Sequence, residues 1–213
     1  MAGFTSCVIA KQPSPLLISY IEHPTASFLN QLLKDAYAEL GLQLQFEPMP
    51  FERGRLMAIR GEVDGLAARV GPIAADLPNM IKVKVPLLKI SIHLICSPQA
   101  ACDNQVLEDP ATTVAVPSGN NHADVIMKEH RAKTLDMKDL QQIMAMLANG
   151  RLSYGLFVIA DRHDPQLGSI QIAQPPLETQ VVYHYLHVKH MALLPDLEKS
   201  LAKVVAAADS VDR

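Results

Sequence analysis

The side chain in this sequence with the clearest potential chemistry is Arg69, which lies near the end of the apolar run GLAARV at residues 65–70. Ligands of open α/β sheets bind at the carboxyl ends of buried parallel strands, and Arg69 is expected there. Its planar guanidinium can hold a carboxylate through two hydrogen bonds. The alternative is a surface ion pair with Asp64 or Glu62. Arg69 is therefore a candidate anion-binding residue.

Four further residues follow the first two expected strands or open the next helix. Tyr20 and Glu22 end the first strand, where Tyr20 could stack on a ligand and Glu22 could meet an ammonium group. Phe51 follows the second strand in a similar place, although aromatic residues at such a rim pack as often as they bind. Arg53 lies near a helix N-terminus, where the helix dipole disfavours a cation. That placement hints at a binding role, and a solvated arginine is the simpler alternative.

A second group of candidates lies in the other half of the chain. Ser118, Gly119, Asn120 and Asn121 form a glycine-containing loop before an expected helix. Unpaired N–H groups at a helix start favour an anion, although Ser or Asn could equally cap that helix. Asp161 belongs to a polar loop after a later strand, where simple solvation is the alternative to ligand contact. The loop at residues 118–121 is expected to approach Arg69 and Tyr20 when a ligand binds.

Other chemistries find little support. His184 and His190 would share one face of a strand while His187 faces away, so a metal site is disfavoured. We identify no P-loop, no GxGxxG motif and no nucleophile elbow. No Cys/His spacing typical of zinc is present either. We therefore expect no catalytic residue, no metal site and no cofactor.

Composition limits the class of protein. The 213 residues are 49% hydrophobic, carry a net charge of −3 and have a pI near 6.2, which argues against nucleic acid or an anionic membrane as partner. The start of the sequence lacks the features of a secretory signal, so the protein is cytoplasmic or a leader has been removed. Cys96 and Cys102 are close enough for a disulfide; pairing and unpaired thiols both stay open, and Cys7 is the odd one out.

A repeated pattern predicts the elements that position these residues. Residues 56–70 and 143–160 each read as a helix, a glycine and an apolar strand. With Gly61 aligned on Gly150, Met57 falls on Met146 and Val63 on Leu152. Glycine ends a helix well because it accepts the left-handed conformation. Two such units about 90 residues apart predict two similar α/β lobes rather than one sheet.

The remaining pattern completes this architecture. The first half reads βαβαβ, with parallel strands and right-handed crossovers. The expected elements, in order, are strand 16–20, helix 27–40, strand 42–48, a helix and strand within 51–70, a crossing strand 87–97 after Pro86, a strand within 112–117, helices 122–130 and 138–149, strands 156–160 and 169–173, a returning strand 180–189 and a last helix from Pro195. Lobe 1 then comprises residues 13–94 and 183–213, and lobe 2 comprises residues 95–182. The two crossings would form a two-segment hinge.

The order of these stretches resembles the type II periplasmic solute-binding proteins that serve polar amino-acid ABC importers. Four segments carry the resemblance: LLISYIE with ELGLQLQFEPMP, FERGRLMAIRGEVDGLAARV, AVPSGNN and LANGRLSYGL. More narrowly, PFERGRLMAIRGEVDG followed by ARV and PNMIKVKVPL is similar to an uncharacterised branch in which an Arg ends the third strand. The usual T-x-x-R after that strand is absent, and Ser153 replaces an expected Asp. An α-amino-acid ligand is therefore less strongly implied than the fold.

The resemblance implies a non-enzymatic function. A small polar or anionic solute, either amino-acid-like or an organic acid, would bind in an interlobe cleft of a monomer in the periplasm. Its partners would be that small-molecule ligand and an ABC transporter permease or a sensor kinase, with no nucleic acid. Two alternatives remain open. One is an enzyme on the same scaffold, such as a small-acid dehydratase, and the other is a cytoplasmic effector-binding domain.

Overall fold

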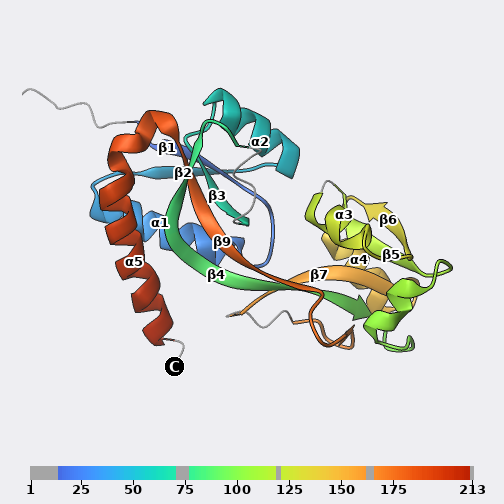
Figure 1. The fold of residues 1–213 in the computed structure, drawn as a ribbon. Coiled ribbons are helices and arrows are strands. Elements are labelled where there is room, and N and C mark those ends of the chain that lie inside the picture. Colours follow the sequence, from blue (N-terminus) through green and yellow to red (C-terminus); the bar gives the residue numbers. More distant parts are fainter. Residues whose placement is uncertain (1–13, 71–76, 119–120, 162–165, 212–213) are drawn as a thin grey trace, which may run out of the picture.

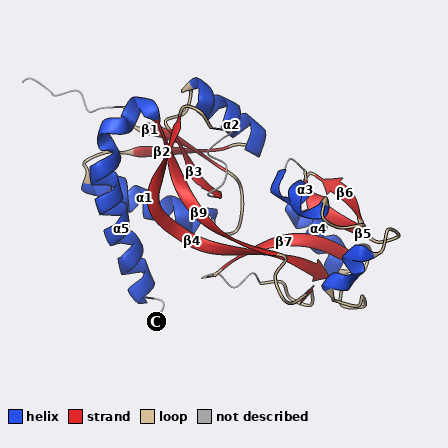
Figure 2. Ribbon diagram, viewed as in Figure 1, coloured by secondary structure: helices blue, strands red, loops and turns tan. Residues whose placement is uncertain are grey.

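A computed structural model describes residues 14–70, 77–118, 121–161 and 166–211. Two groups of helices and strands lie at opposite ends of a pair of long strands that run between them (Figure 1). The fold is α/β, as predicted, with helices packed against the strands of both groups (Figure 2). Nothing among the described helices is long and apolar enough to span a membrane.

Lobe 1 begins with the predicted βαβαβ unit. It comprises β1 (Leu16–Tyr20), α1 (Ala26–Glu39), β2 (Leu44–Pro48), α2 (Phe51–Arg60) and β3 (Gly65–Val70). The strands are parallel and lie in the order β2-β1-β3. Helix α1 forms because its apolar residues recur at helical spacing, and Leu29, Leu32, Leu33 and Ala36 are all buried. The carboxyl ends of β1 and β3 therefore lie side by side, which places Arg69 near the end of β1.

Two long strands connect the lobes. β4 (Met80–Cys96) and β9 (Glu178–His187) are antiparallel and pair from Met80 opposite His187 to Ile92 opposite Glu178. The sequence predicted a crossing strand that begins after Pro86, and that boundary is wrong. β4 continues through Pro86, with irregular register on both sides of it. Proline lacks the N–H that the ladder needs, so a strand tolerates it at such an irregularity.

Lobe 2 restarts the α/β pattern. It comprises β5 (Thr113–Pro117), α3 (Asn121–Met127), β6 (Lys133–Met137), α4 (Leu140–Ala148), β7 (Tyr154–Ala160) and the short β8 (Gln171–Ile172), after the 3-10 helix η2 (Asn104–Glu108). β5 is parallel to both β6 and β7, whereas β4 is antiparallel to β7 and β8. Cys96 at the end of β4 forms a disulfide with Cys102.

The predicted repeat is present in three dimensions. Gly61 after α2 and Gly150 after α4 have φ angles of 73° and 74°, the left-handed conformation that favours glycine. Each is followed at the same spacing by a strand, β3 from Gly65 and β7 from Tyr154. The two αβ units are thus built alike, although few of their residues are identical.

The expectation of two separate sheets is wrong. Hydrogen bonding joins the strands into one nine-stranded sheet in the order β2-β1-β3-β9-β4-β7-β5-β6, with β8 beside β4. The ladder is continuous because β4 pairs with β9 and, further along, with β7. The lobes differ instead in their hydrophobic cores. The predicted boundaries, 13–94 with 183–213 and 95–182, fall inside or at the ends of these shared strands and stay a prediction.

The apolar side chains form four clusters, two mainly in each lobe, and Ala160 of β7 joins the larger lobe 1 cluster. In lobe 1 one cluster lies between α1, α5 (Leu194–Val211) and the sheet, and a second lies beneath α2. In lobe 2 one cluster involves α3 and η2, and the other involves α4. The last helix returns to lobe 1, as predicted, with Leu197, Leu201 and Val205 buried against α1 and β4.

A histidine lies within the core of lobe 1. His184 on β9 is fully buried, its Nδ1 lies 2.8 Å from the Leu66 carbonyl oxygen, and its Nε2 lies 2.9 Å from the Tyr37 hydroxyl. A carbonyl only accepts, so Nδ1 carries the proton and Nε2 accepts from Tyr37. Burial lowers the pKa of His184 to about 4 from its usual 6.5. This explains its presence as a neutral core residue rather than a metal ligand.

Acid should therefore destabilise the protein through His184. Between pH 6.5 and 4 the unfolded chain binds a proton at this position that the folded chain does not, so stability falls as pH falls. The loss should reach about 3 kcal/mol by pH 4. Chemical denaturation of His184→Gln, measured from pH 7.5 to 5, should show a flatter pH dependence than wild type. His130→Gln, which removes a ring paired with Glu108 outside the core, is the control. Equal slopes for His184→Gln and wild type would contradict the assignment.

Candidate functional site

Arg69 is a buried cation that forms no ion pair with any residue in the described part of the chain. Its side chain is 5% exposed, and Nη1 donates a hydrogen bond of 2.7 Å to the Ala68 carbonyl oxygen. The ring of Phe51 at the start of α2 lies over the guanidinium, 5.3 Å from Cζ. Nη2 is buried and has no hydrogen-bond partner among the residues that the structure describes. Burial lowers the pKa of Arg69 to about 10, so the group still carries its charge at neutral pH.

The sequence left open a surface ion pair between Arg69 and Asp64 or Glu62, and the structure pairs both acidic residues with other groups. Asp64 instead accepts hydrogen bonds from Lys189 Nζ at 2.8 Å, His190 Nε2 at 2.6 Å and the backbone N–H of Leu17 at 2.7 Å. Burial opposes ionisation of Asp64, but these hydrogen bonds together hold its pKa below the usual value. Glu62 pairs with Arg60 at 3.8 Å. Asp64 and Glu62 are therefore engaged elsewhere, and neither of them compensates the charge of Arg69.

Two residues that are not among the predicted candidates, Ser19 and Gly54, lie close to the Arg69 side chain. Ser19 on β1 is fully buried, and its Oγ also has no hydrogen-bond partner. Gly54 lies in the middle of α2, and a Cβ added there would be 2.9 Å from Ser19 Oγ and 3.3 Å from Arg69 Nη2. Glycine inside a helix costs about 1 kcal/mol relative to alanine. A serine inside an apolar strand and a glycine inside a helix were the available signals.

The other lobe 1 candidates lie in different surroundings, and they differ in whether they contact Arg69. Phe51 is the one brought into contact with Arg69. Tyr20 is half-buried, and its ring makes an edge contact of 6.4 Å with Phe46, within the α1-side core. Alternate residues of a strand face opposite sides, so Tyr20 points away from the face that carries Ser19. Glu22 and Arg53 are exposed.

The lobe 2 candidates are only partly described. Ser118 is exposed, and its backbone N–H donates to the Met137 carbonyl oxygen at 2.8 Å. Gly119 and Asn120 lie outside the described residues. Asn121 begins α3, and its side chain also lies outside what the structure describes. Asp161 is exposed just after β7, where its N–H donates 3.0 Å to the Lys89 carbonyl oxygen. No described contact joins these residues to Arg69.

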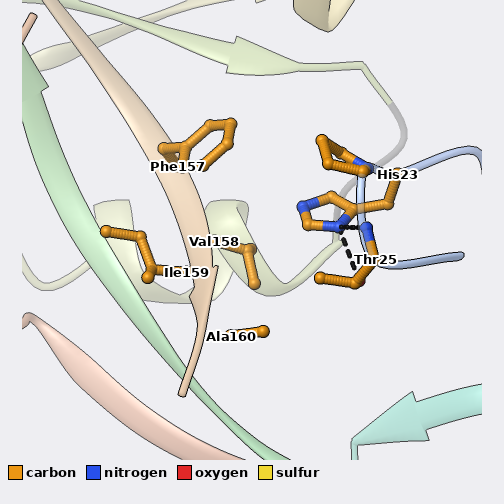
Figure 3. Close-up of a pocket in the computed structure, with 7 residues that line it drawn as sticks. His23, Thr25, Phe157, Val158, Ile159 and Ala160 are labelled. Atoms are coloured by element: carbon orange, nitrogen blue, oxygen red, sulfur yellow. Dashed lines mark hydrogen bonds between the residues drawn. The ribbon is translucent and has the colours of Figure 1, made fainter. Parts of the chain in front are cut away.

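A hollow is present where the two lobes meet. It is lined by the segment after β1 and by β7, with an open volume of about 200 Å³ (Figure 3). The ring of His23 faces that of Phe157 at 6.0 Å, and His23 Nδ1 is hydrogen-bonded to Thr25. The lining of this hollow is mostly apolar, whereas a site for a polar solute needs several convergent polar groups. The charge that could recognise a polar solute lies instead at Arg69, which does not line the hollow.

Comparison with known proteins defines the fold. No protein-family model matches the sequence, and no curated protein matches it either. Solved structures do match. One is the GluR0 ligand-binding core complexed with L-glutamate, with a TM-score of 0.75 and 12% identity over 92% of this chain and 95% of that one. Another is truncated, arginine-bound ArgBP from T. maritima, with a TM-score of 0.72 and 14% identity over 89% and 95%.

A third similar structure is the substrate-binding protein of an amino acid ABC transporter, with a TM-score of 0.68 and 13% identity over 93% and 94%. At these identities the likeness establishes the architecture. The chain has the two-lobed fold of type II periplasmic solute-binding proteins, which confirms the predicted fold class. Of these three neighbours, one is complexed with L-glutamate, one is bound to arginine and one is a substrate-binding protein.

Removing the buried charge of Arg69 should not lower the free energy of unfolding of the ligand-free protein. Replacing a buried ionic group by an apolar one of similar length is often neutral or stabilising. Arg69→Met should therefore leave the free energy of unfolding unchanged or raise it by up to about 2 kcal/mol. Denaturant unfolding without added solute measures this.

The matched control is Arg55→Met, which removes a half-exposed arginine 3.0 Å from Glu52 on the same helix. Arg55→Met should lower the free energy of unfolding by no more than about 1 kcal/mol. A loss of several kcal/mol in Arg69→Met alone would mean that Arg69 serves the fold rather than a ligand.

Proposed function

We propose that this protein reversibly binds a small anionic solute, amino-acid-like or an organic acid, with Arg69 as the anchor for its carboxylate. The observation that carries the proposal is the buried guanidinium whose Nη2 lacks a partner. An unpaired buried charge costs several kcal/mol unless something neutralises it. A carboxylate supplies both the opposite charge and the missing acceptor, and the planar fork of arginine suits it.

Two facts support a solute of this class. The neighbours with the same fold include one complexed with L-glutamate and one bound to arginine, and both of those solutes carry a carboxylate. The ring of Phe51 also lies 5.3 Å from Arg69 Cζ, a cation–π contact that favours the charged guanidinium in this buried place. We infer that Phe51 and Arg69 act together, whereas Tyr20 serves mainly to pack lobe 1.

The biological role that fits this binding is the substrate-binding component of a transporter or a sensor. Its partners would then be an ABC transporter permease or a sensor kinase, and its place the periplasm. An enzyme such as a small-acid dehydratase is the alternative on the same scaffold, and assaying candidate acids for product distinguishes it. A cytoplasmic effector-binding domain is the third possibility, and the coding region upstream of this sequence distinguishes that.

The binding proposal can be tested directly. A thermal-shift screen of amino acids and organic acids should identify a stabilising solute, whose affinity is then measured by calorimetry. Arg69→Ala should weaken binding by about 1.5–3 kcal/mol, the value of a hydrogen bond to a charged group. That corresponds to roughly 10- to 150-fold in Kd. Arg69→Lys should bind the solute little better than Arg69→Ala, because the point charge of lysine cannot form the two parallel hydrogen bonds of a guanidinium.

The control for this measurement is Arg60→Ala. It removes an exposed arginine from the same lobe that pairs with Glu62, and it should leave the affinity unchanged. A solute that binds wild type and Arg69→Ala equally tightly would remove Arg69 from the site.

Binding should also bring the lobes together. One lobe offers too few donors to replace the hydration of a polar solute, so the closed state gains contacts that the open state lacks. We expect the loop at residues 118–121 to provide part of the lobe 2 contribution. The solute found in the screen should therefore reduce the radius of gyration measured by solution X-ray scattering. Arg69→Ala at the same solute concentration should stay expanded. Tight binding without compaction would place the whole site in one lobe.

A further inference from the structure

The unpaired atoms around Arg69 converge on one point. Ser19 Oγ, Arg69 Nη2 and the α2 backbone at Gly54 surround the position that a Cβ of residue 54 would occupy. Ser19 and Arg69 are both at least nine-tenths buried, and each directs an unpartnered polar atom there. The three residues come from β1, β3 and α2, so no local pattern brings them together.

The chemistry of Ser19 Oγ and Arg69 Nη2 indicates which group could bind between them. A guanidinium N–H can only donate, and a serine hydroxyl can donate as well as accept. Two donors aimed at one place beside a fixed positive charge suit an oxygen that carries negative charge. The missing side chain at Gly54 matters because a Cβ there would stand within 2.9 Å of Ser19 Oγ, closer than real contacts allow.

We propose that Ser19, Arg69 and Gly54 form an oxyanion subsite that holds one carboxylate oxygen of the solute, with Gly54 kept as glycine so that this oxygen can approach the α2 backbone. The proposal rests on solute binding at Arg69 and adds the atoms that select the anionic group. Phe51 is half-buried, and its ring lies 5.3 Å from Arg69 Cζ, beside this subsite.

The shape of the subsite selects a planar anion. A carboxylate has two coplanar oxygens, so one can enter between β1 and α2 while the rest of the group stays in that plane. Phosphate and sulfate carry oxygens in four directions, and one of these would meet the α2 backbone at Gly54. The subsite should therefore prefer carboxylates to tetrahedral oxyanions of similar size, although both carry the charge that Arg69 attracts.

Acetate and inorganic phosphate are suitable probes because they carry the anionic group alone. The Arg69 Nε–Hε signal in ¹⁵N NMR spectra, assigned by its loss in Arg69→Lys, reports occupancy of the subsite. Acetate should shift this signal saturably in wild type, and phosphate should bind at least ~10-fold more weakly. Ser19→Ala should weaken acetate about 10-fold, the equivalent of one charged hydrogen bond. Gly54→Ala should abolish the saturable shift.

A double variant separates binding from folding. Ser19→Ala with Gly54→Ala removes the Oγ that the new Cβ would touch, so the fold should be kept while acetate binding stays lost. Phosphate binding as tightly as acetate, no acetate shift at Arg69, or unchanged acetate affinity in Gly54→Ala would each overturn the subsite. A larger solute whose affinity needs Arg69 but neither Ser19 nor Gly54 would overturn the subsite and leave solute binding in place. A solute that binds independently of Arg69 would overturn both proposals.

Discussion

The antiparallel pairing of β4 with β9 is the constraint on which this structure depends. β9 joins the parallel strands of lobe 1 through β3, and β4 joins those of lobe 2 through β7. Each lobe therefore completes its sheet with a strand that also belongs to the other. The register is irregular near Pro86, where β4 lacks a backbone donor. At Pro86 the sheet still includes β3, because Tyr183 of β9 pairs with both Pro86 and Arg69, so the irregular register lies within the sheet of lobe 1.

Lobe 1 is held together by polar groups as well as by its core. Asp64 fixes the segment after β9 to the turn before β3 by binding Lys189 and His190. His184 and Tyr37 link β9 to α1, and Ser200 links α5 to α1 through the Ala36 carbonyl oxygen at 2.8 Å. Each of these groups has its partner, so they stabilise the lobe without needing a ligand.

Arg69 and Ser19 contrast with these satisfied groups. They lie in the same lobe and are just as buried, yet Nη2 and Oγ have no partner. Such groups cost free energy in the folded state unless a ligand completes them. Binding sites often carry groups of this kind, since the stability lost without ligand is recovered when the ligand is bound.

The sequence by itself determined the order of the elements and the repeated αβ unit, and it named Arg69 as a candidate whose role in binding is still a proposal. Helical spacing, strand runs and the glycines at 61 and 150 act within a few residues, so they can be read without the fold. Gly119 and Asn120 remain predictions, because they lie outside the described residues. Only the tertiary structure decided that β4 and β9 pair, that one sheet results, and that Tyr20 faces the core. It also brought Ser19 and Gly54 to Arg69. These outcomes depend on contacts between residues from 15 (Gly54 and Arg69) to 107 (Met80 and His187) positions apart, which local patterns do not specify.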